Sequence, residues 1–414
     1  MMYIAVFFYN IGIWAYQFGI KMVAPFHAKA NLWVKGRRDL LHKIASIKRG
    51  EERLVWFHAA SLGEFEQGRP VMEKLRELEP NTKIVLTFFS PSGYEIRKNY
   101  TGADYIFYLP MDTPANVQRF LKIIRPDAAV FVKYEYWYNY LSYLHKLCIP
   151  TYLISAIFRS EQPFFKKWGF MYRAMLQFFT KIYVQDEESV ERLQTIGITH
   201  VEKIGDTRFD RVKQIADIAK RIEKVEKFSD SRQVIVCGST WPADEEIIIK
   251  YINHDTSGYK WILVPHEIEE SHILAILEKC KKSCARYTDE TTDIEKCDVL
   301  VVDAIGFLSS IYRYGSIAYI GGGFGKGIHN TLEAAIYGIP VVFGPKYLKF
   351  KEAVELIAQG GGFSIKNEKE FFSLFDSLIN TPAITQTAGQ SASKYVNSQL
   401  GATDVIIPTL SINK

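Results

Sequence analysis

Short apolar runs alternate with longer amphipathic stretches along most of this chain, and the alternation occurs twice. The apolar runs of the first set lie at residues 54–57, 83–89, 105–109, 128–132, 151–156 and 181–185, and those of the second at 234–240, 260–265, 298–303 and 316–323. A polar, charged helical stretch near residues 205–232 separates the two sets. Such alternation is typical of a parallel sheet with helices on both faces. We therefore predict an α/β fold of two doubly wound, Rossmann-like lobes.

The chain length agrees with two lobes, since 414 residues suggest two domains or more. The predicted divisions are an N-terminal anchor at 1–28, a first lobe at 29–205, a second lobe at 206–390 and a C-terminal tail at 391–414. Ligands of such sheets bind at the carboxyl ends of the strands, and two facing lobes form a cleft. We expect the functional residues to follow strands.

The N-terminal segment is apolar and is followed by basic residues. Residues 2–20 carry no charge, and residues 21–50, the basic collar, hold eight Lys or Arg against one acid, Asp39. An apolar stretch of this length is barely long enough to span a bilayer, and a basic flank stays in the cytoplasm. Ala28-Lys29-Ala30 fits a signal-peptide cleavage site, but the cationic flank lies on the wrong side. We expect a membrane anchor, either spanning or interfacial, with the remaining chain cytoplasmic.

Several classes of site are disfavoured by residue spacing. The five cysteines are scattered without a C-x-x-C pair, which argues against a disulfide framework or a zinc site. The Asp-x-Asp pair that holds a sugar nucleotide through a metal in one class of glycosyltransferases is missing from the sequence. We predict no metal and no cofactor. Nucleic-acid binding is also disfavoured, because the basic collar adjoins the apolar segment and no recognised module accompanies it.

The stretch His58-Ala-Ala-Ser-Leu-Gly-Glu64 follows the apolar run at 54–57 and places Glu64 in the first turn of a predicted helix. One interpretation is a favourable interaction of an acid with the helix dipole. The other is that Glu64 is a positioned base. Glu66 is the nearest competitor for that role, and we expect His58 to make a structural hydrogen bond at the end of its strand.

Glycines cluster after the last apolar run of the second set, at residues 321–327, ahead of a helix predicted to open near His329 or Asn330. Glycines allow a ligand close to the backbone, and a helix N-terminus offers free N–H groups to an anion. Lys326 would add charge, and Glu333 is placed to accept hydrogen bonds from ribose hydroxyls. The pattern fits neither G-x-G-x-x-G nor the Walker motif. A flexible turn before an ordinary helix is the alternative.

Taken together, the motifs make the chain similar to the transferases of 3-deoxy-D-manno-octulosonic acid (Kdo). The resemblance covers nearly the whole chain. It rests on residues 58–64, on a Y-L-P-x-D to R-P-D segment ending in Glu135, Trp137 and Asn139, on Gly205 to Asp210, on Gly238-Ser239-Thr240 with Glu245 and Glu246, and on Gly327, His329, Asn330, Glu333 and Phe343-Gly344-Pro345. The family's P-R-H-P-E stretch reads Pro265-His266-Glu267-Ile268-Glu269 here, without the arginine.

The resemblance implies a glycosyltransferase of the two-lobed GT-B type that transfers Kdo from CMP-Kdo to the lipid A precursor with inversion, in lipopolysaccharide biosynthesis. It implies Glu64 as the catalytic base, kept ionised by its helix N-terminus. The implied substrate-binding residues are Ser61, Gly63, Glu135, Asn139, Arg208, Gly238, Ser239, Thr240, Lys326, Gly327, His329, Asn330 and Glu333. Arg208 is an equal candidate for an ion pair with Asp206 or Asp210, and Ser239 and Thr240 for helix capping. Location on the cytoplasmic face of the inner membrane, through residues 1–28 and the basic collar, follows from a lipid acceptor.

Two other functions stay open at the level of sequence. One is a different GT-B sugar-nucleotide enzyme, either a UDP-sugar glycosyltransferase or an epimerase, with the same phosphate-binding helix. The other is a membrane-tethered binding protein of the same fold without catalysis. The sequence leaves the number of Kdo residues added, the acyl pattern of the acceptor and the oligomeric state undetermined.

Overall fold

A computed structural model describes residues 2–47 and 50–411 of the chain. The chain divides into two compact units, unit 1 at Met1–Arg211 with Gly401–Lys414, and unit 2 at Val212–Leu400. The division falls after Arg211, inside helix α10 (Thr207–Ile218), instead of after residue 205. The C-terminal segment is not a separate tail, because α19 (Ala402–Leu410) packs against α4 (Leu62–Leu78) of unit 1.

Unit 1 is built on a seven-stranded, wholly parallel sheet with the order β3-β2-β1-β4-β5-β6-β7. Its strands are β1 (Leu54–Ala59), β2 (Lys83–Phe88), β3 (Tyr105–Tyr108), β4 (Ala128–Val132), β5 (Thr151–Ala156), β6 (Lys181–Val184) and β7 (Val201–Lys203). The six apolar runs predicted as strands in this half are confirmed. All residues of β1, β4 and β5 are buried, as expected of strands covered on both faces.

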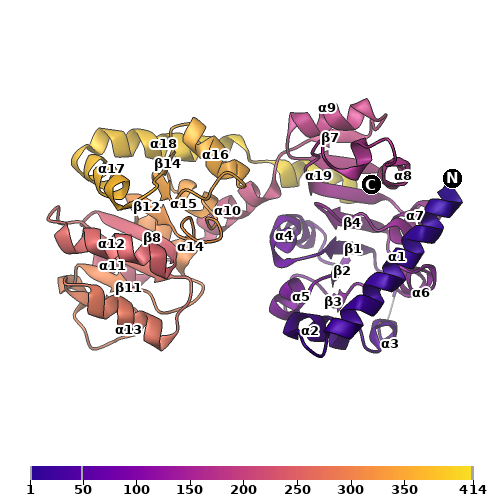
Figure 1. Cartoon of the computed structure of the whole chain (residues 1–414), viewed down its shortest axis with the longest axis horizontal. Helices are drawn as coiled ribbons and strands as arrows, with labels where there is room; N and C mark the ends of the chain where they lie inside the picture. Colours follow the sequence, from indigo (N-terminus) through magenta and orange to yellow (C-terminus); the bar gives the residue numbers. More distant parts are fainter. Residues whose placement is uncertain (1, 48–49, 412–414) are drawn as a thin grey trace. The chain divides into compact units, whose positions relative to one another are not determined.

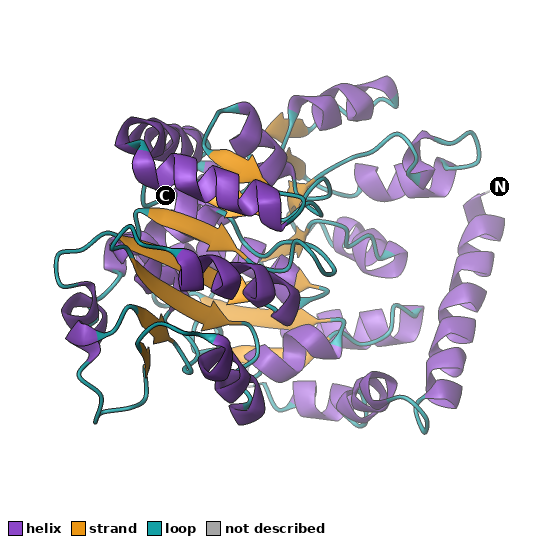
Figure 2. Cartoon of the chain, turned by 60° about the vertical axis from the view of Figure 1, so that its left-hand side comes forward, coloured by secondary structure: helices purple, strands orange, loops and turns teal. Residues whose placement is uncertain are grey.

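Helices cover both faces of this sheet (Figures 1 and 2). Besides α4 and α19 they are α2 (Ala28–Gly36), α3 (Leu40–Ala45), α5 (Pro91–Arg97), α6 (Pro114–Ile124), α7 (Tyr138–Lys146), α8 (Phe170–Gln177) and α9 (Glu187–Thr195). Asp210 accepts hydrogen bonds from the backbone N–H groups of Gly401 and Thr403, each at 2.7 Å, and so holds the start of α19. These bonds explain why the end of the chain returns to unit 1.

Unit 2 repeats the plan with a second parallel seven-stranded sheet, in the order β10-β11-β9-β8-β12-β13-β14. Its strands are β8 (Val234–Thr240), β9 (Lys260–Pro265), β10 (Cys284–Arg286), β11 (Val299–Val301), β12 (Ile317–Ile320), β13 (Val341–Phe343) and β14 (Gly362–Ser364). Its helices are α11 (Glu223–Ser229), α12 (Pro242–His254), α13 (Glu270–Lys279), α14 (Leu308–Ile311), α15 (Leu332–Ala335), α16 (Lys351–Ala358), α17 (Glu368–Asn380) and α18 (Pro382–Ser398).

Each sheet has one topological switch point, where the connections from two neighbouring strands lead toward opposite edges of the sheet. In unit 1 that point lies between β1 and β4, and in unit 2 between β8 and β12. The loops that leave two such strands diverge, so a crevice is available at their carboxyl ends, where open α/β sheets bind ligands. Glu64 and Glu135 follow β1 and β4, Ser239 is the penultimate residue of strand β8, at its carboxyl end, and the glycine cluster follows β12. The sequence motifs therefore lie at the topological switch points.

Helix α1 (Met2–Val23) is long and apolar enough to cross a membrane by length and composition. One of its faces is attached to unit 1: Tyr9 donates a hydrogen bond to Asp112 at 2.6 Å, Asn139 donates one to Asn10 at 2.9 Å, and Ile13 is buried. The opposite face is an apolar stripe of exposed side chains (Ile4, Phe7, Ile11, Trp14, Phe18 and Met22). Helix α1 therefore packs against unit 1 through one face, and the apolar stripe on its other face is exposed.

The buried carboxylate of Asp112 is central to this attachment, and its loss is expected to destabilise unit 1. It accepts hydrogen bonds from Tyr9, from the backbone N–H groups of Asn139 and Tyr140, and from the Asn139 amide. We expect Asp112→Ala to lower the free energy of unfolding by more than about 2 kcal/mol, because several buried donors lose their acceptor. Urea unfolding followed by tryptophan fluorescence measures it, and an unchanged midpoint would contradict the role of Asp112.

Candidate active site and donor-binding loop

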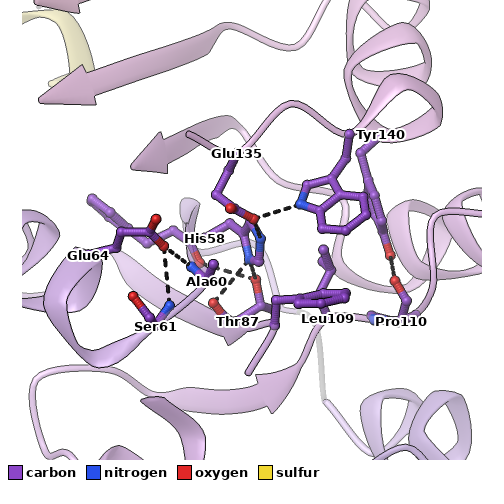
Figure 3. A network of polar contacts seen from close by, with 12 residues as sticks. His58, Ala60, Ser61, Glu64, Thr87, Leu109, Pro110, Glu135 and Tyr140 are labelled. Carbon is purple, nitrogen blue, oxygen red and sulfur yellow. Dashed lines mark hydrogen bonds and ion pairs between the residues drawn. The ribbon is translucent and has the colours of Figure 1, made fainter. Parts of the chain in front are cut away.

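Glu64 lies in the first turn of α4, directly after β1, with its carboxylate turned back toward the strand end (Figure 3). Its Oε2 accepts hydrogen bonds from the backbone N–H groups of Ala60, at 2.5 Å, and Ser61, at 3.2 Å. This is the geometry of a glutamate at position N3 reaching back to the N-cap residue. The backbone therefore fixes the direction of the carboxylate, as a positioned base requires.

A buried polar network lies beside Glu64 (Figure 3). Nε2 of His58 is 2.7 Å from Oε2 of Glu135, and the Trp137 indole N–H donates to the same oxygen at 2.7 Å. Nδ1 of His58 contacts Oγ1 of Thr87 at 2.9 Å and its carbonyl oxygen at 3.1 Å. His58 is fully buried and makes the structural hydrogen bonds predicted for it.

The pKa of the Glu64 carboxyl is raised from 4.5 to about 7, first by its burial and second by the negative charge of Glu135. The hydrogen bonds from Ala60 and Ser61 and the charge of Lys133 lower this pKa but do not cancel the rise. The expectation that the helix N-terminus keeps Glu64 fully ionised was therefore wrong. The group is poised near neutral pH, where a general base works best.

Ser61 and Gly63 flank the carboxylate at the start of α4. Ser61 is the N-cap residue, and Gly63 is exposed, with open space where a Cβ would stand. Packing within the protein therefore does not require glycine at this position. The surface beside Glu64 is left free of side-chain atoms at residue 63, which suits the approach of a bulky ligand.

Asn139, predicted to bind substrate, is buried, and its side chain makes hydrogen bonds within unit 1. Its amide donates to the carbonyl oxygen of Asp112 at 2.6 Å and to Oδ1 of Asn10 at 2.9 Å. The side chain therefore links the start of α7 to the loop after β3 and to helix α1. Glu135 acts on Glu64 directly, because its negative charge raises the pKa of the Glu64 carboxyl.

Arg208 pairs with Asp206, which was one of its two predicted roles. Its Nε donates to Oδ2 of Asp206 at 2.8 Å, and its backbone N–H donates to Oδ1 at 2.9 Å. The Asp206 carboxylate is buried and also accepts from the Gln67 amide, at 3.3 Å. The hydrogen bonds from Gln67 attach this segment, at the start of α10, to helix α4 of unit 1.

In unit 2, internal packing requires glycine both near the end of β8 and directly after β12. A Cβ at Gly238 would stand 2.0 Å from the Tyr312 hydroxyl, and one at Gly321 would stand 2.2 Å from the carbonyl oxygen of Ser239. Thr240 is buried and donates to Glu245 at 2.9 Å, and Glu245 in turn lies 2.7 Å from Nε2 of His272. Ser239 has a left-handed backbone, with φ 52°. Strained residues of this kind cluster at functional sites.

The loop that follows β12 brings together the remaining predicted residues. Lys326 is exposed, and Gly327 has φ 142°, a conformation that favours glycine. Asn330 donates to Glu333 at 2.9 Å and accepts from the backbone of Leu332 at 3.1 Å. The predicted helix opening near His329 was wrong: α15 begins at Leu332 and has four residues, too few for the expected dipole effect on a phosphate.

Two residues of this region were missed by sequence reasoning. Asp244, in the first turn of α12, is buried and accepts hydrogen bonds from Gly322 N–H, from the Tyr319 hydroxyl and from Trp241 N–H. Trp241 donates its indole N–H to His329. An acid three residues after a helix N-cap was the available signal for Asp244. Within residues 2–47 and 50–411, no group of three or more His, Cys, Asp or Glu is placed to hold a metal ion.

Comparison with known proteins identifies the family. Residues 35–211 match the family model described as 3-deoxy-D-manno-octulosonic-acid transferase (kdotransferase). A 3-deoxy-D-manno-octulosonic acid transferase of Aquifex aeolicus is 32% identical over 332 residues, which cover 79% of this chain and 86% of that protein. The chain belongs to the Kdo transferase family. A Kdo transferase of Rickettsia typhi is 27% identical, over 88% of this chain and 80% of the other.

Solved structures agree with the two-lobed α/β fold of this Kdo transferase. The UDP-GlcNAc 2-epimerase of Neisseria meningitidis, bound to UDP-GlcNAc, superposes with a TM-score of 0.59 at 15% identity, covering 87% of this chain and 99% of that one. MurG of Acinetobacter baumannii gives a TM-score of 0.55 at 13% identity, over 86% and 98% of the two chains. These likenesses show the GT-B-type fold alone. As a family member the protein is a glycosyltransferase, so the predicted fold class and enzyme class are confirmed.

Proposed function

We propose that this Kdo transferase uses CMP-Kdo as its donor and the lipid A precursor as its acceptor, with inversion at the anomeric carbon. The observation that carries the proposal is Glu64, a carboxylate fixed by two backbone N–H groups at the switch point of unit 1, with its pKa raised to about 7. A sugar hydroxyl needs a base as the new bond forms, and direct attack by that hydroxyl inverts the carbon it attacks.

Glu64 takes the proton of the attacking hydroxyl, and the bond from the anomeric carbon to CMP breaks as the new bond forms. The raised pKa makes Glu64 a stronger base than an ordinary carboxylate, while about half of the molecules are still ionised at pH 7. Glu135 therefore contributes to the reaction through its charge. Ser61 and Gly63 border the face that the acceptor approaches.

Unit 2 holds the donor in this proposal. The candidate contacts are the exposed Lys326, the glycine-rich backbone at Gly238 and Gly327, and the polar groups of Ser239, Thr240, His329, Asn330 and Glu333. We expect CMP to bind without added metal and UMP to bind at least about tenfold more weakly in isothermal titration calorimetry, since the base edge distinguishes the two nucleotides. Equal binding of UMP would favour a UDP-sugar donor instead.

We further propose that the protein lies on the cytoplasmic face of the inner membrane, with α1 in the interface. The apolar stripe is between 47% and 66% exposed, whereas the opposite face is bonded to Asp112 and Asn139. A spanning helix would have to leave those polar partners, at a cost of several hydrogen bonds. An interfacial helix keeps them and inserts its apolar stripe between lipid headgroups.

The basic collar supports this placement with five exposed cations: Lys21, Lys29, Lys35, Arg38 and Lys43. Each contributes about 1 kcal/mol of attraction to an anionic surface. Arg37 is different, because its guanidinium stands 3.9 Å above the Trp33 ring and donates to the carbonyl oxygens of Leu109 and Phe89. Burial lowers the pKa of Arg37 to about 9. Lys48 and Arg49 lie outside the described residues.

We expect the charge of Glu135 to influence the pH dependence of the transfer rate. The transfer rate at saturating substrates is expected to rise with pH through an apparent pKa of about 7, because Glu64 must lose its proton to act as a base. Glu135→Gln removes the negative charge that raises this pKa, so the rising limb is expected to move to lower pH. A pH–rate profile of both proteins measures the shift.

The matched control is Glu66→Gln. Glu66 is on the same helix, pairs with Arg97 at 2.9 Å and is not among the groups that shift the pKa of Glu64. Its profile is expected to coincide with that of the unmodified protein. A Glu135→Gln profile that also coincides would contradict the electrostatic role of Glu135.

A further inference from the structure

Three aromatic rings stack at the carboxyl edge of the sheet in unit 2. Trp241 follows β8, His266 follows β9, and His329 precedes α15. The ring centroids of Trp241 and His266 are 4.6 Å apart, and those of His266 and His329 are 4.5 Å apart. The rings of Trp241 and His329 are nearly parallel, at 9°. Trp241 and His266 come directly after two neighbouring strands and His329 comes from the loop that follows β12, so the stack lies at the switch point between β8 and β12.

The hydrogen bond between Trp241 and His329 determines where the imidazole carries its proton. Nε1 of Trp241 lies 3.0 Å from Nε2 of His329. An indole nitrogen is a donor only, so Nε2 must present a lone pair. His329 is therefore neutral in this arrangement, with its single proton on Nδ1. Burial, and second the neighbouring His266, lower the pKa of His329 to about 4, which agrees with a neutral ring near pH 7.

No acceptor for the Nδ1–H group of His329 is found in residues 2–47 and 50–411. Among the described residues, the hydrogen bonds of His329 are the one from Trp241 and one from its backbone N–H to Gly321, at 3.2 Å. The residue is half-buried and lies between Gly327 and Asn330 of the glycine-rich loop after β12, which is the donor-binding loop in the proposed function. A polar N–H in such a place is normally satisfied by water or by a ligand.

The charged groups around His329 leave it neutral over a wide pH range. His266 is the titratable group that faces it from β9. From α12, Asp244 is bonded to Gly322 and Tyr319, and Glu245 is bonded to Thr240 and His272. On its own segment, Glu333 accepts from Asn330, and Lys326 is exposed. A carboxylate in contact with the ring, which would favour the imidazolium, is not found among these described groups.

We propose that Trp241 is a positioning residue that holds His329 in its uncharged Nδ1–H form, and that this N–H donates to an anionic oxygen of the bound sugar nucleotide. The inference rests on the proposed function, since it concerns the donor-binding loop. The anionic oxygen belongs either to the phosphate of the nucleotide or to the carboxylate of the sugar acid. The contact does not depend on protonating a histidine, so it persists on both sides of pH 6.5.

The first experiment uses the full chain without ligand. Long-range proton–nitrogen NMR of histidine-labelled protein reports the tautomer and the pKa of each imidazole, and His329→Gln assigns the signal. We expect His329 to be an Nδ1–H tautomer that stays neutral down to about pH 5. Trp241→Phe keeps a stacking ring but removes the N–H donor, so the pKa of His329 should rise and the Nε2–H tautomer should appear. Titration of His329 near pH 6.5, or no change in Trp241→Phe, would overturn the proposal.

The second experiment adds CMP, cytidine, Kdo or CMP-Kdo to the same labelled protein. A shift of the His329 Nδ1 resonance with CMP but not with cytidine assigns the contact to the phosphate. A shift with Kdo or only with CMP-Kdo assigns it to the carboxylate. No shift, while calorimetry shows CMP and CMP-Kdo to be bound, overturns the ligand contact. If neither nucleotide binds, the proposed donor and this contact both fail, while the tautomer result of the first experiment stands independently.

Discussion

Replacing Glu64 by glutamine is expected to reduce the rate of Kdo transfer by about 10²–10⁴-fold while leaving CMP binding unchanged. Glutamine keeps the size of the side chain, and its carbonyl oxygen can still accept the hydrogen bond that Ala60 donates at 2.5 Å. It cannot take a proton at neutral pH, so the loss isolates proton transfer. Transfer is measured from the conversion of lipid acceptor, and CMP affinity is measured by calorimetry.

The matched control is Glu66→Gln, on the exposed side of the same helix. Glu66 forms ion pairs with Arg97, at 2.9 Å, and Arg69, at 3.7 Å, and such pairs contribute little to stability. We expect nearly full activity. Loss of transfer in Glu66→Gln with activity retained in Glu64→Gln would exchange the roles of the two residues, and loss of CMP binding in Glu64→Gln would show that Glu64 is not a catalytic base.

The double substitution Phe7→Ser and Trp14→Ser is expected to lower binding to anionic vesicles by about thirtyfold, which corresponds to about 2 kcal/mol. Both residues belong to the apolar stripe and are 61% and 62% exposed. Partial insertion of two large apolar side chains into the interface supplies free energy of this size. Co-sedimentation with vesicles of phosphatidylethanolamine and phosphatidylglycerol measures the partition coefficient.

Ile384→Ser provides the control, since this exposed apolar residue lies on α18 of unit 2 and outside the N-terminal segment. Vesicle binding should be unchanged. The transfer rate of the double variant should also recover on acceptor dispersed in detergent, because Glu64 and its network are untouched. Unchanged binding of the Phe7→Ser and Trp14→Ser variant would contradict an interfacial α1.

Much of the fold followed from the sequence because buried parallel strands are continuous apolar runs. All ten runs predicted as strands are strands. Four strands of three residues each were missed. The edge strands β7, β10 and β14, with the sequences Val-Glu-Lys, Cys-Ala-Arg and Gly-Phe-Ser, show no period, and β13, with the sequence Val-Val-Phe, is too short to stand out. The return of the C-terminal segment to unit 1 could not be predicted, because Asp210, which holds the start of α19, acts over a long sequence separation.

The candidate site was only partly accessible to sequence reasoning. The position of Glu64 at the start of a helix followed from the short motif 58–64. Its raised pKa could not be predicted, because it depends on burial and on Glu135, which follows a different strand, β4. Asn139 was assigned to substrate from its place in the family motif, and its hydrogen bonds to Asp112 and Asn10 could not be predicted because both partners are distant in sequence. The start of α15 was predicted too early, since the glycine-rich loop continues in irregular backbone until Thr331.

The most direct test of the account is the product of the reaction. Purified protein is incubated with lipid A precursor and freshly generated CMP-Kdo in the presence of EDTA, and the molecular mass of the lipid product is measured by mass spectrometry. We predict a mass increase of one or more Kdo residues, and the number of increments gives the number of residues transferred. An unchanged lipid, with folded protein and intact CMP-Kdo, would contradict the proposed donor and acceptor.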